Sequence, residues 1–338
     1  MEKFNFVITD YKSVGLYSNE VNDIFHSKTG ALKEAFDKFI LPCFLKESFS
    51  SKTSLNILDI CYGIGYNTKA AISIMPDNFN LSIDCLEYCD DFVRLSPFIY
   101  DSLNRLDISL FLFSQIKYND FEFIDKLKNY EPFFSKDMLD FLSFIKKEGY
   151  ISNPSDDYVV FLHNIYYKYI ANSMKQDLNL NKYNKTQINF HIGDARIKIN
   201  DCKYIYDVVF LDAFSPQKDP TLWTIDFLSL VKEKMNENSI LVSYSKSTPF
   251  RSALSQLGFY VGKTFIDEVD MGTIASLDKS KIINPLTEYD VQLLNTRSGI
   301  TYKDANLDLN SDEILINREI EQKNSNLISH TQFLKKYS

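Results

Sequence analysis

Residues 55–67 read LNILDICYGIGYN, and this stretch decides the fold. A short apolar run from Leu55 to Ile60 leads into a turn that carries Gly63 and Gly65. Because glycine has no Cβ, the backbone can bend sharply at these positions and let a ligand approach closely. A buried strand that turns in this way into a helix predicts a nucleotide-type cradle at the carboxyl end of the strand.

Six further runs repeat the apolar, β-branched character of this first strand. They are Leu81 to Leu86, Ile188 to Ile192, Tyr206 to Leu211, Ser239 to Tyr244, Gly258 to Phe265 and Gly272 to Ser276. The earlier runs are continuously apolar rather than alternating, which is typical of strands buried on both faces of a parallel sheet. Helix-length stretches such as Leu222 to Met235 lie between and after them. This alternation predicts an α/β, doubly wound fold.

The alternation stops in the middle of the chain. The stretches FLFSQI, YNDFEFIDKL, FFSKDMLDFLSFIKK and DDYVVFLHNIYYKYI repeat Phe, Tyr, Leu and Ile at spacings of three and four, which predicts helices. The polar tail contains one structured-looking patch, EILINREIEQ. We therefore expect an N-terminal substrate-side segment (1–50), a Rossmann-like core (51–100 and 186–277), a helical insertion (101–185) and a C-terminal extension (278–338).

Composition and charge exclude several classes of protein. With 338 residues, 45% of them hydrophobic, the chain can bury a large core, so disorder is not its dominant state. The 37 basic residues against 45 acidic ones give a net charge of -8, which does not attract nucleic acid or an anionic membrane; a local basic patch stays possible. Because no apolar run reaches the ~18 residues of a membrane span and no signal peptide is visible, we expect a soluble, cytoplasmic protein.

The five cysteines are Cys43, Cys61, Cys85, Cys89 and Cys202. Their odd number and scattered positions argue against a disulfide framework and favour a reducing compartment. Cys85 and Cys89 lie close in sequence, but no second Cys/His pair completes a zinc site. We therefore expect small buried hydrophobic residues here and no bound metal.

The first strand points to the cofactor. The turn lacks the GxGxxG of a dinucleotide site, because position 68 is Thr. The acid at the end of the strand, Asp59, fits S-adenosylmethionine better than a pyrophosphate, because the sulfonium and amino groups of that cofactor are cationic. Tyr62 and Asn67, in the same stretch, complete the candidate cradle.

Two more strand ends supply acids to the same edge of the sheet. Glu87 follows the second strand about 20 residues after Gly65, where it could accept hydrogen bonds from both ribose hydroxyls. In HIGDAR, Gly193 gives a tight turn, and Asp194 could accept from the adenine amino group. With the cradle, these residues predict a cofactor site along the carboxyl edge of the sheet.

The fourth strand leads into the loop FLDAFSPQKDPTLWT, which begins at residue 210. Asp212 ends a wholly apolar strand, a costly place for a charge that has no role. Pro216 and Pro220 stiffen the loop that follows. Since ligands bind outside the carboxyl ends of strands in such sheets, we expect Asp212 to lie between cofactor and substrate.

These motifs together resemble the methyltransferase half of MnmC and its single-domain, MnmD-like relatives. FLDAFSPQKDPTLW carries the resemblance together with LYSNEVNDIFHSKTGALKEAFDKFILP, ILDICYGIGYN and SYSKSTPFRSALSQLGF. It covers roughly residues 10 to 100 and 188 to 277. One departure lies in the cradle, where Cys61 stands in place of the first glycine that the family usually has.

The resemblance implies a Rossmann-like class I S-adenosylmethionine-dependent methyltransferase with a seven-stranded, mostly parallel sheet. The implied reaction converts 5-aminomethyl(-2-thio)uridine to 5-methylaminomethyl(-2-thio)uridine at the wobble position of tRNA, with the anticodon stem-loop as partner. The FAD-dependent oxidase half of MnmC is absent, so no FAD is expected. The oligomeric state and any separate oxidase stay open.

Under this reading, we place Asp212 and Tyr244 in the catalytic centre. Methyl transfer to an amine depends mainly on orientation, and Asp212 would accept an N–H bond and orient the lone pair. Tyr244, Phe214 and Trp223 could stack on a flipped base beside Pro216. Phosphate contacts would come from four cations around the mouth, Lys218, Lys246, Arg251 and Lys263.

Two alternatives belong to other classes. An aminopropyltransferase of the spermidine synthase type shares the sheet, the cradle and an amine substrate, but it needs a paired-acid pocket, and Ala213 and Phe214 follow Asp212 without a second acid. A non-catalytic module could keep the cofactor fold for binding tRNA or protein, with Cys61 as a sign of decay. The acids retained at the strand ends argue against that decay.

Overall fold

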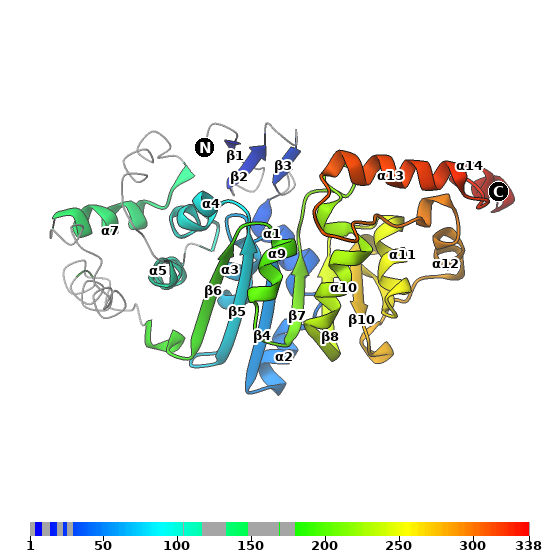
Figure 1. Ribbon diagram of the computed structural model, residues 1–338. Helices are drawn as coiled ribbons and strands as arrows, with labels where there is room; N and C mark the ends of the chain where they lie inside the picture. Colours follow the sequence, from blue (N-terminus) through cyan, green and yellow to red (C-terminus); the bar gives the residue numbers. More distant parts are fainter. Residues whose placement is uncertain are drawn as a thin grey trace.

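The computed structural model describes residues 4–8, 14–18, 23–25, 30–103, 105–116, 133–147, 169 and 180–337. Its centre is a seven-stranded sheet in the order β6-β5-β4-β7-β8-β10-β9 (Figure 1). The strands are β4 (Ser54–Ile60), β5 (Asn80–Glu87), β6 (Thr186–Ile192), β7 (Tyr206–Leu211), β8 (Met235–Ser243), β9 (Tyr260–Ile266) and β10 (Val269–Ser276). Only β10 pairs antiparallel within this sheet, with β8 and β9. The predicted α/β fold with a mostly parallel sheet is confirmed.

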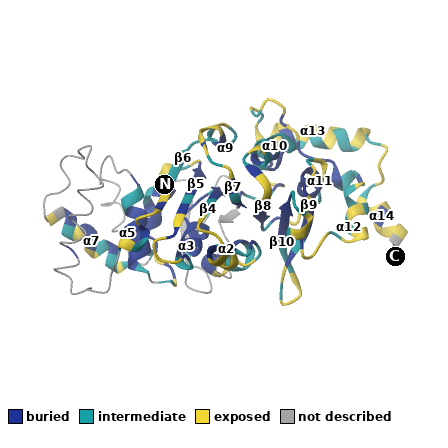
Figure 2. Ribbon diagram, turned by 90° about the horizontal axis from the view of Figure 1, so that it is seen from below, coloured by how far each residue is buried: buried dark blue, intermediate teal, exposed yellow. Residues whose placement is uncertain are grey.

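The strands are apolar on both sides because helices cover both faces of the sheet (Figure 2). Leu55 and Ile57 of β4 belong to one core cluster, and Leu58 and Ile60 belong to the other. The first cluster is shared with α1 (Ala31–Ala35), α2 (Leu45–Ser51), α3 (Tyr66–Ser73), α4 (Asp90–Leu95), α5 (Leu106–Gln115) and α7 (Lys136–Lys147). The second is shared with α9 (Ala195–Lys198), α10 (Ile225–Glu233), α11 (Thr248–Gln256) and α13 (Ser311–Asn324).

Short helices and the remaining C-terminal helices complete the described structure. They are η1 (Phe36–Ile40), η2 (Ser96–Phe98), η4 (Leu180–Tyr183), η5 (Ile199–Asp201), η6 (Thr221–Trp223), η7 (Lys279–Lys281), α12 (Glu288–Leu294), η8 (Arg297–Gly299) and α14 (His330–Tyr337). In the described parts of the chain, no helix has both the length and the apolar character that a membrane span requires.

The stretch predicted as one helix from Leu222 to Met235 is shorter than expected. The Oγ1 of Thr224 accepts from the backbone N–H of Phe227 at 3.2 Å and caps α10, so the helix begins only at Ile225. At the other end, Met235 already pairs with β7, and β8 therefore starts before the predicted strand. Only the bounds change, because the order of elements is as predicted.

A small antiparallel sheet lies above the carboxyl edge of the main sheet (Figure 1). It contains β1 (Phe4–Ile8), β2 (Val14–Ser18) and β3 (Asp23–Phe25). Tyr66, the first residue of α3, joins it to the cradle, because its Oη accepts from the N–H of Val14 at 3.1 Å and donates to the carbonyl of Val14 at 2.9 Å. The N-terminal segment is therefore fixed beside the expected cofactor turn.

The middle and the tail of the chain are described in part. Helices α5 and α7 lie where FLFSQI and FFSKDMLDFLSFIKK predict them. The helices predicted over 118–127 and, apart from Tyr169, over 156–170 lie outside the described residues. In the tail, α13 contains the EILINREIEQ patch, so its predicted structure is confirmed. The division into four segments stays a prediction.

Candidate active site

The cradle turn between β4 and α3 is built on left-handed backbone. Cys61, Gly63 and Gly65 have φ values of +67°, +57° and +85°. A Cβ at Gly65 would lie 2.4 Å from the phenolic oxygen of Tyr62, whereas a Cβ at Gly63 would meet nothing within 4 Å. Gly65 is therefore required for packing, while Gly63 borders open space. Cys61 adopts the left-handed backbone conformation that favours glycine.

The side chain of Tyr62 supports this turn by packing against Gly65. Its side chain is buried, its Oη lies 2.7 Å from the Oγ of Ser96, and its ring packs edge-on against Phe190. The sequence predicts that Tyr62 takes part in binding the cofactor. Its ring packs against Gly65 and holds the shape of the turn, so a contact of Tyr62 with the cofactor stays a prediction for its backbone.

Asp59 is a fully buried acid at the end of β4. Its Oδ2 accepts from the Oγ1 of Thr68 at 2.7 Å, while its Oδ1 has no hydrogen-bond partner among the described residues. Burial, together with the negative charges of Asp212 and Glu87, raises the pKa of Asp59 to about 7. Thr68 opposes this rise by donating to the carboxylate. The three acids therefore converge on one region.

Glu87 ends β5 beside the cradle. Its Oε2 accepts from the N–H of Gly63 at 2.8 Å, and its Oε1 accepts from the N–H of Cys89 at 2.9 Å. The N–H of Gly193, after β6, donates to the backbone carbonyl of Glu87 at 2.9 Å. Burial raises the pKa of the Glu87 carboxyl. The structure thus brings Gly63, Glu87 and Gly193 together, as the strand order predicts.

Asp212 follows β7 at the same edge. Its backbone N–H donates to the carbonyl of Ile60 at 3.1 Å, which fixes the loop against the end of β4. The Nδ2 of Asn67 donates to the Oδ2 of Asp212 at 2.9 Å, and the Oδ1 of the buried Asn67 has no partner in the described structure. The half-buried carboxylate of Asp212 therefore faces the start of α3.

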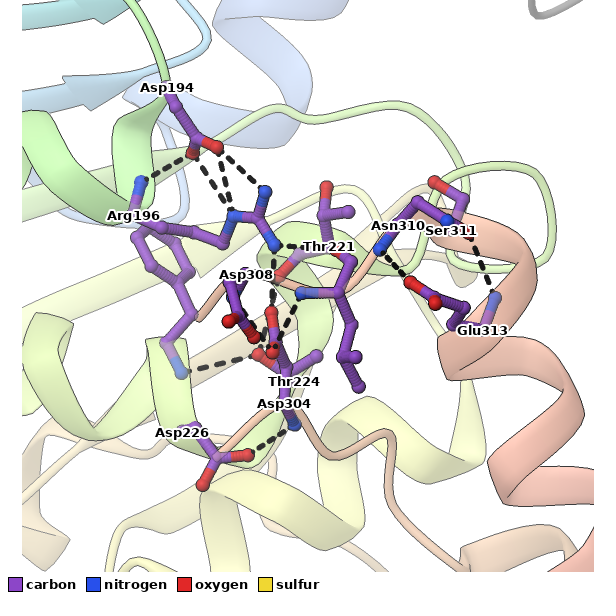
Figure 3. A network of polar contacts seen from close by, with 12 residues as sticks. Asp194, Arg196, Thr221, Thr224, Asp226, Asp304, Asp308, Asn310, Ser311 and Glu313 are labelled. Atoms are coloured by element: carbon purple, nitrogen blue, oxygen red, sulfur yellow. Dashed lines mark hydrogen bonds and ion pairs between the residues drawn. The ribbon is translucent and has the colours of Figure 1, made fainter. Parts of the chain in front are cut away.

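Asp194 has structural partners that its motif did not reveal (Figure 3). It caps α9 by accepting from the N–H of Arg196 at 2.9 Å, and both its oxygens accept from the guanidinium of Arg196. Arg196 also donates to Asp304 at 2.7 Å. Asp194 is still partly exposed, so it stays a candidate for the adenine amino group with an orientation set by Arg196.

Aromatic residues surround the loop after β7. The Oη of Tyr244 donates to the carbonyl of Ala213 at 2.8 Å, and the Nζ of Lys38 lies 5.5 Å from the centre of the Tyr244 ring. Phe214 is half-buried, and its carbonyl accepts from the Nε1 of Trp223 at 2.7 Å. Phe214 therefore belongs to the loop that follows Asp212, and Tyr244 contacts this loop.

Trp223 and Pro216 are both buried in this structure, in contrast to the stacking role predicted for Trp223 and the place beside the base predicted for Pro216. The exposed fraction of Trp223 is 0%, and its ring packs edge-on against Phe250 at 4.8 Å between centroids. A fully buried ring cannot stack on a base. Stacking by Trp223 is therefore corrected to a structural role, in which the indole holds the loop through Phe214.

The four predicted cations do not form one phosphate patch. Arg251 is 6% exposed, and it donates to Thr273 and to the carbonyl of Gly272, each at 2.9 Å. Lys263 forms an ion pair with Asp290. The predicted phosphate role of Arg251 is wrong, because internal acceptors use its guanidinium. Lys218 and Lys246 are exposed, and Lys246 donates to the carbonyl of Asp270 at 3.0 Å.

Three residues at this edge were missed by the sequence reasoning. Thr68 was noted only as a break in the dinucleotide pattern, although it holds Asp59. Arg196 stands in the quoted HIGDAR motif, and Lys38 stands in the quoted N-terminal motif. Thr68 and Arg196 lie next to or near candidate residues in the sequence, which is a signal that could have found them. Lys38 offers no such signal, because its contact with Tyr244 joins distant segments.

A second polar cluster, separate from the candidate cofactor site, contains Asp84 of β5, His191 of β6 and Cys202. One ligand atom each of Asp84, His191 and Cys202 lies within 4.8 Å of the others, which could hold a metal ion. However, Asp84 already accepts from Asn189 at 2.8 Å, contacts the Nε2 of His191 at 3.1 Å and accepts from Tyr206. These hydrogen bonds satisfy the carboxylate without a metal. The expectation of no bound metal stays a prediction.

Comparison with known proteins gives this edge a family context. A family model described as an S-adenosyl-L-methionine-dependent methyltransferase matches residues 158–265. The uncharacterized protein MJ0670 of Methanocaldococcus jannaschii is 31% identical over 321 residues, which is 94% of this chain and 72% of that protein.

Two further similarities involve proteins called MnmC. The tRNA 5-methylaminomethyl-2-thiouridine biosynthesis bifunctional protein MnmC of Paracidovorax citrulli is 34% identical over 76 residues, which is 22% of this chain and 12% of that protein. The crystal structure of MnmC2 from Aquifex aeolicus has a TM-score of 0.67 and 25% identity, covering 95% of this chain and 86% of that one. The match to MnmC2 therefore extends over the whole fold.

Proposed function

Because this chain belongs to the S-adenosyl-L-methionine-dependent methyltransferases of the MnmC2 type, we propose that it methylates the amine of a 5-aminomethyl uridine at the wobble position of tRNA. The observation that carries this proposal is the pair of Asp212 and Asn67 at the edge where the acids Asp59 and Glu87 converge. The names of the MnmC relatives support tRNA as the substrate.

The cradle fits S-adenosylmethionine. Asp59 and Asn67 each have a buried oxygen without a partner among the described residues, and the space beside Gly63 is open. A buried acceptor without a partner is costly, so a donor from a bound ligand would stabilise it. The converging acids favour a cationic ligand, because the negative charges of Asp212 and Glu87 raise the pKa of Asp59 and a cation would relieve that repulsion. Asp59, Gly63, Glu87 and Asn67 would therefore hold the cofactor, which supplies an electrophilic methyl group.

Asp212 would act on the acceptor amine. An alkyl amine is largely protonated at pH 7, by analogy with Lys at about 10.4, and must lose a proton before it can attack. A carboxylate that accepts an N–H bond orients the amine lone pair and stabilises positive charge that develops on nitrogen. Asn67 restricts Asp212 to one orientation through their hydrogen bond, so the carboxylate is oriented before the substrate binds.

The acceptor base would lie beside Tyr244 and Phe214. Both border the loop after Asp212, and a base stacked on an aromatic ring gains about 1 to 3 kcal/mol. The exposed Lys218 and Lys246 are the candidates that remain for phosphate contacts. With a net charge of -8, the affinity for the anticodon stem-loop should be modest and should fall as the salt concentration rises.

The direct test is methylation of a defined tRNA. Purified protein with labelled S-adenosylmethionine should label tRNA whose wobble uridine carries an aminomethyl group, and digestion should recover the label in 5-methylaminomethyluridine. The same tRNA with an unmodified wobble uridine is the control and should stay unlabelled. Absence of label in the aminomethyl tRNA, or its recovery in another nucleoside, would exclude the proposed reaction. Transfer from decarboxylated cofactor to putrescine would indicate an aminopropyltransferase instead.

A further inference from the structure

The C-terminal extension reaches the cofactor edge through one arginine (Figure 3). The guanidinium of Arg196 divides its donors between two carboxylates. Its Nε and Nη2 donate to Asp194, with the shortest contact 2.7 Å, while its Nη1 donates to Asp304 at 2.7 Å and to the carbonyl of Leu309 at 2.8 Å. Arg196 thus connects an acid of the cofactor edge to a tail residue 108 positions later.

Asp304 is built into the protein as a fixed anchor. Its side chain is 0% exposed, and its Oδ1 accepts from the backbone N–H groups of Asp308 and Leu309 at 3.1 and 3.2 Å. Its own N–H donates to Asp226 in the first turn of α10 at 2.6 Å. A buried carboxylate needs such partners, so its position relative to α10 is rigid and Arg196 is its cationic partner.

The same part of the tail also holds the loop that carries Asp212. The Oγ of Ser311 donates to the Oδ1 of Asp219 at 2.9 Å, and this oxygen also accepts from Thr221. Figure 3 shows Ser311 at the start of α13, close to the Asp304 turn. The tail is therefore attached to α9, which follows β6, and to the loop after β7.

Asp194 lies where its orientation matters for cofactor recognition. It directly follows Gly193, whose N–H is bonded to the backbone of Glu87, the acid expected to bind ribose. Arg196 contacts both oxygens of Asp194, so it selects the rotamer of this side chain. A bidentate guanidinium fixes the plane of a carboxylate, which a lysine cannot do.

We infer that Asp304 and Arg196 are positioning residues for cofactor selectivity: the tail fixes Arg196, and Arg196 orients Asp194 toward the 6-amino group of the adenine. The inference rests on the proposed cofactor site and on the role that the sequence predicts for Asp194, as acceptor from the adenine amino group. It gives the C-terminal extension a role in choosing an amino purine over a 6-oxo purine. A 6-oxo purine would place a carbonyl oxygen against the Asp194 carboxylate in place of an N–H donor, so two acceptors would face each other and binding should weaken.

The test compares S-adenosylhomocysteine with S-inosylhomocysteine, which carries a 6-oxo group, by calorimetry on the full chain. The wild-type protein should bind the adenosyl compound more tightly by at least about tenfold. Asp304→Asn keeps the size of the side chain but removes its charge, and Arg196→Lys keeps the charge but removes the planar fork. Each should reduce this preference severalfold, mainly by weakening adenosyl binding.

Lys303→Gln is the matched control. It removes the exposed ion pair of Lys303 with Glu321 in the neighbouring tail position and leaves Arg196 untouched, so the preference should stay at its wild-type value. If Asp304→Asn fails to fold, Arg196→Lys still decides the question. An unchanged preference in the folded variants, or no preference in the wild-type protein, would overturn the inference. Because no tRNA is needed, this outcome is independent of whether the proposed tRNA reaction is correct.

Discussion

The side-chain amide of Asn67 donates to the Oδ2 of Asp212 at 2.9 Å, although 145 residues separate them in the sequence. The contact arises because β4 and β7 are neighbours in the sheet, so Asn67 in the first turn of α3, after β4, meets Asp212, which follows β7. It orients the acid that we place next to the acceptor amine.

Replacing Asp212 should therefore impair turnover more than cofactor binding. Asp212→Asn should lower the methylation rate by about 100-fold or more, because the amide cannot stabilise positive charge on the attacking nitrogen. Single-turnover assays would measure the rate, and calorimetry would measure the affinity for S-adenosylhomocysteine. Asp207→Asn, at the opposite end of the same strand, is the control and should leave both unchanged. Equal losses of rate and affinity would assign Asp212 to the cofactor site alone.

The buried carboxyl of Asp59 should make stability depend on pH. Its pKa is raised to about 7 in the folded protein from an ordinary value of 3.8. The folded state therefore binds the proton more tightly than the unfolded state, and this contribution to stability is lost as the pH rises from about 4 to 7. Without bound cofactor, Asp59→Asn should thus gain in Tm relative to the wild-type protein between pH 5 and pH 8. A difference in Tm that stays constant with pH would contradict the assigned pKa.

Substitution by alanine should destabilise the protein much more at Gly65 than at Gly258, a glycine outside the site with the same φ value. Gly65→Ala places a Cβ 2.4 Å from the Tyr62 oxygen, whereas the Cβ of Gly258→Ala would meet only the end of a lysine side chain at 3.9 Å. Their φ values of +85° and +86° make the backbone cost the same, about 1 to 2 kcal/mol. Chemical denaturation should show a larger loss of stability for Gly65→Ala. Equal losses would mean that Tyr62 moves aside at little cost.

At position 61, the usual order of stability for glycine and alanine variants should be reversed. With φ at +67°, Cys61→Gly should be more stable than Cys61→Ala by up to about 1 kcal/mol, although glycine normally destabilises ordered structure relative to alanine. Both variants remove the sulfur, so their difference isolates the backbone term. Denaturant midpoints of the two variants measure this difference in stability. A higher midpoint for Cys61→Ala than for Cys61→Gly would show that the turn relaxes.

The elements of the sheet could be predicted because their signals are local. Seven apolar runs, each followed by a turn or a helix, predicted the strands, and the order of parallel strands brings their carboxyl ends to one edge. For this reason the sequence predicts that Asp59, Glu87 and Asp212 lie at the same edge of the sheet, and the structure brings them together there. The signal for the cradle is equally local, because its glycines allow the positive φ values that the turn requires.

The partners of side chains were decided by the tertiary structure. The sequence predicts that Trp223 stacks on a base, but its ring packs against Phe250 and its indole N–H donates to Phe214. It also predicts that Arg251 binds phosphate, but β10 supplies the acceptors of this guanidinium. The sequence predicts a role for Asp194 in binding adenine. It does not show that Arg196, which contacts Asp194, is held by Asp304 in the tail. The sequence by itself thus determined the strands, the cradle and the edge that carries the acids, because these follow from short-range patterns. Only folding decided which polar groups are satisfied internally and which face a ligand, because a hydrogen bond depends on distance in space and not on separation along the chain.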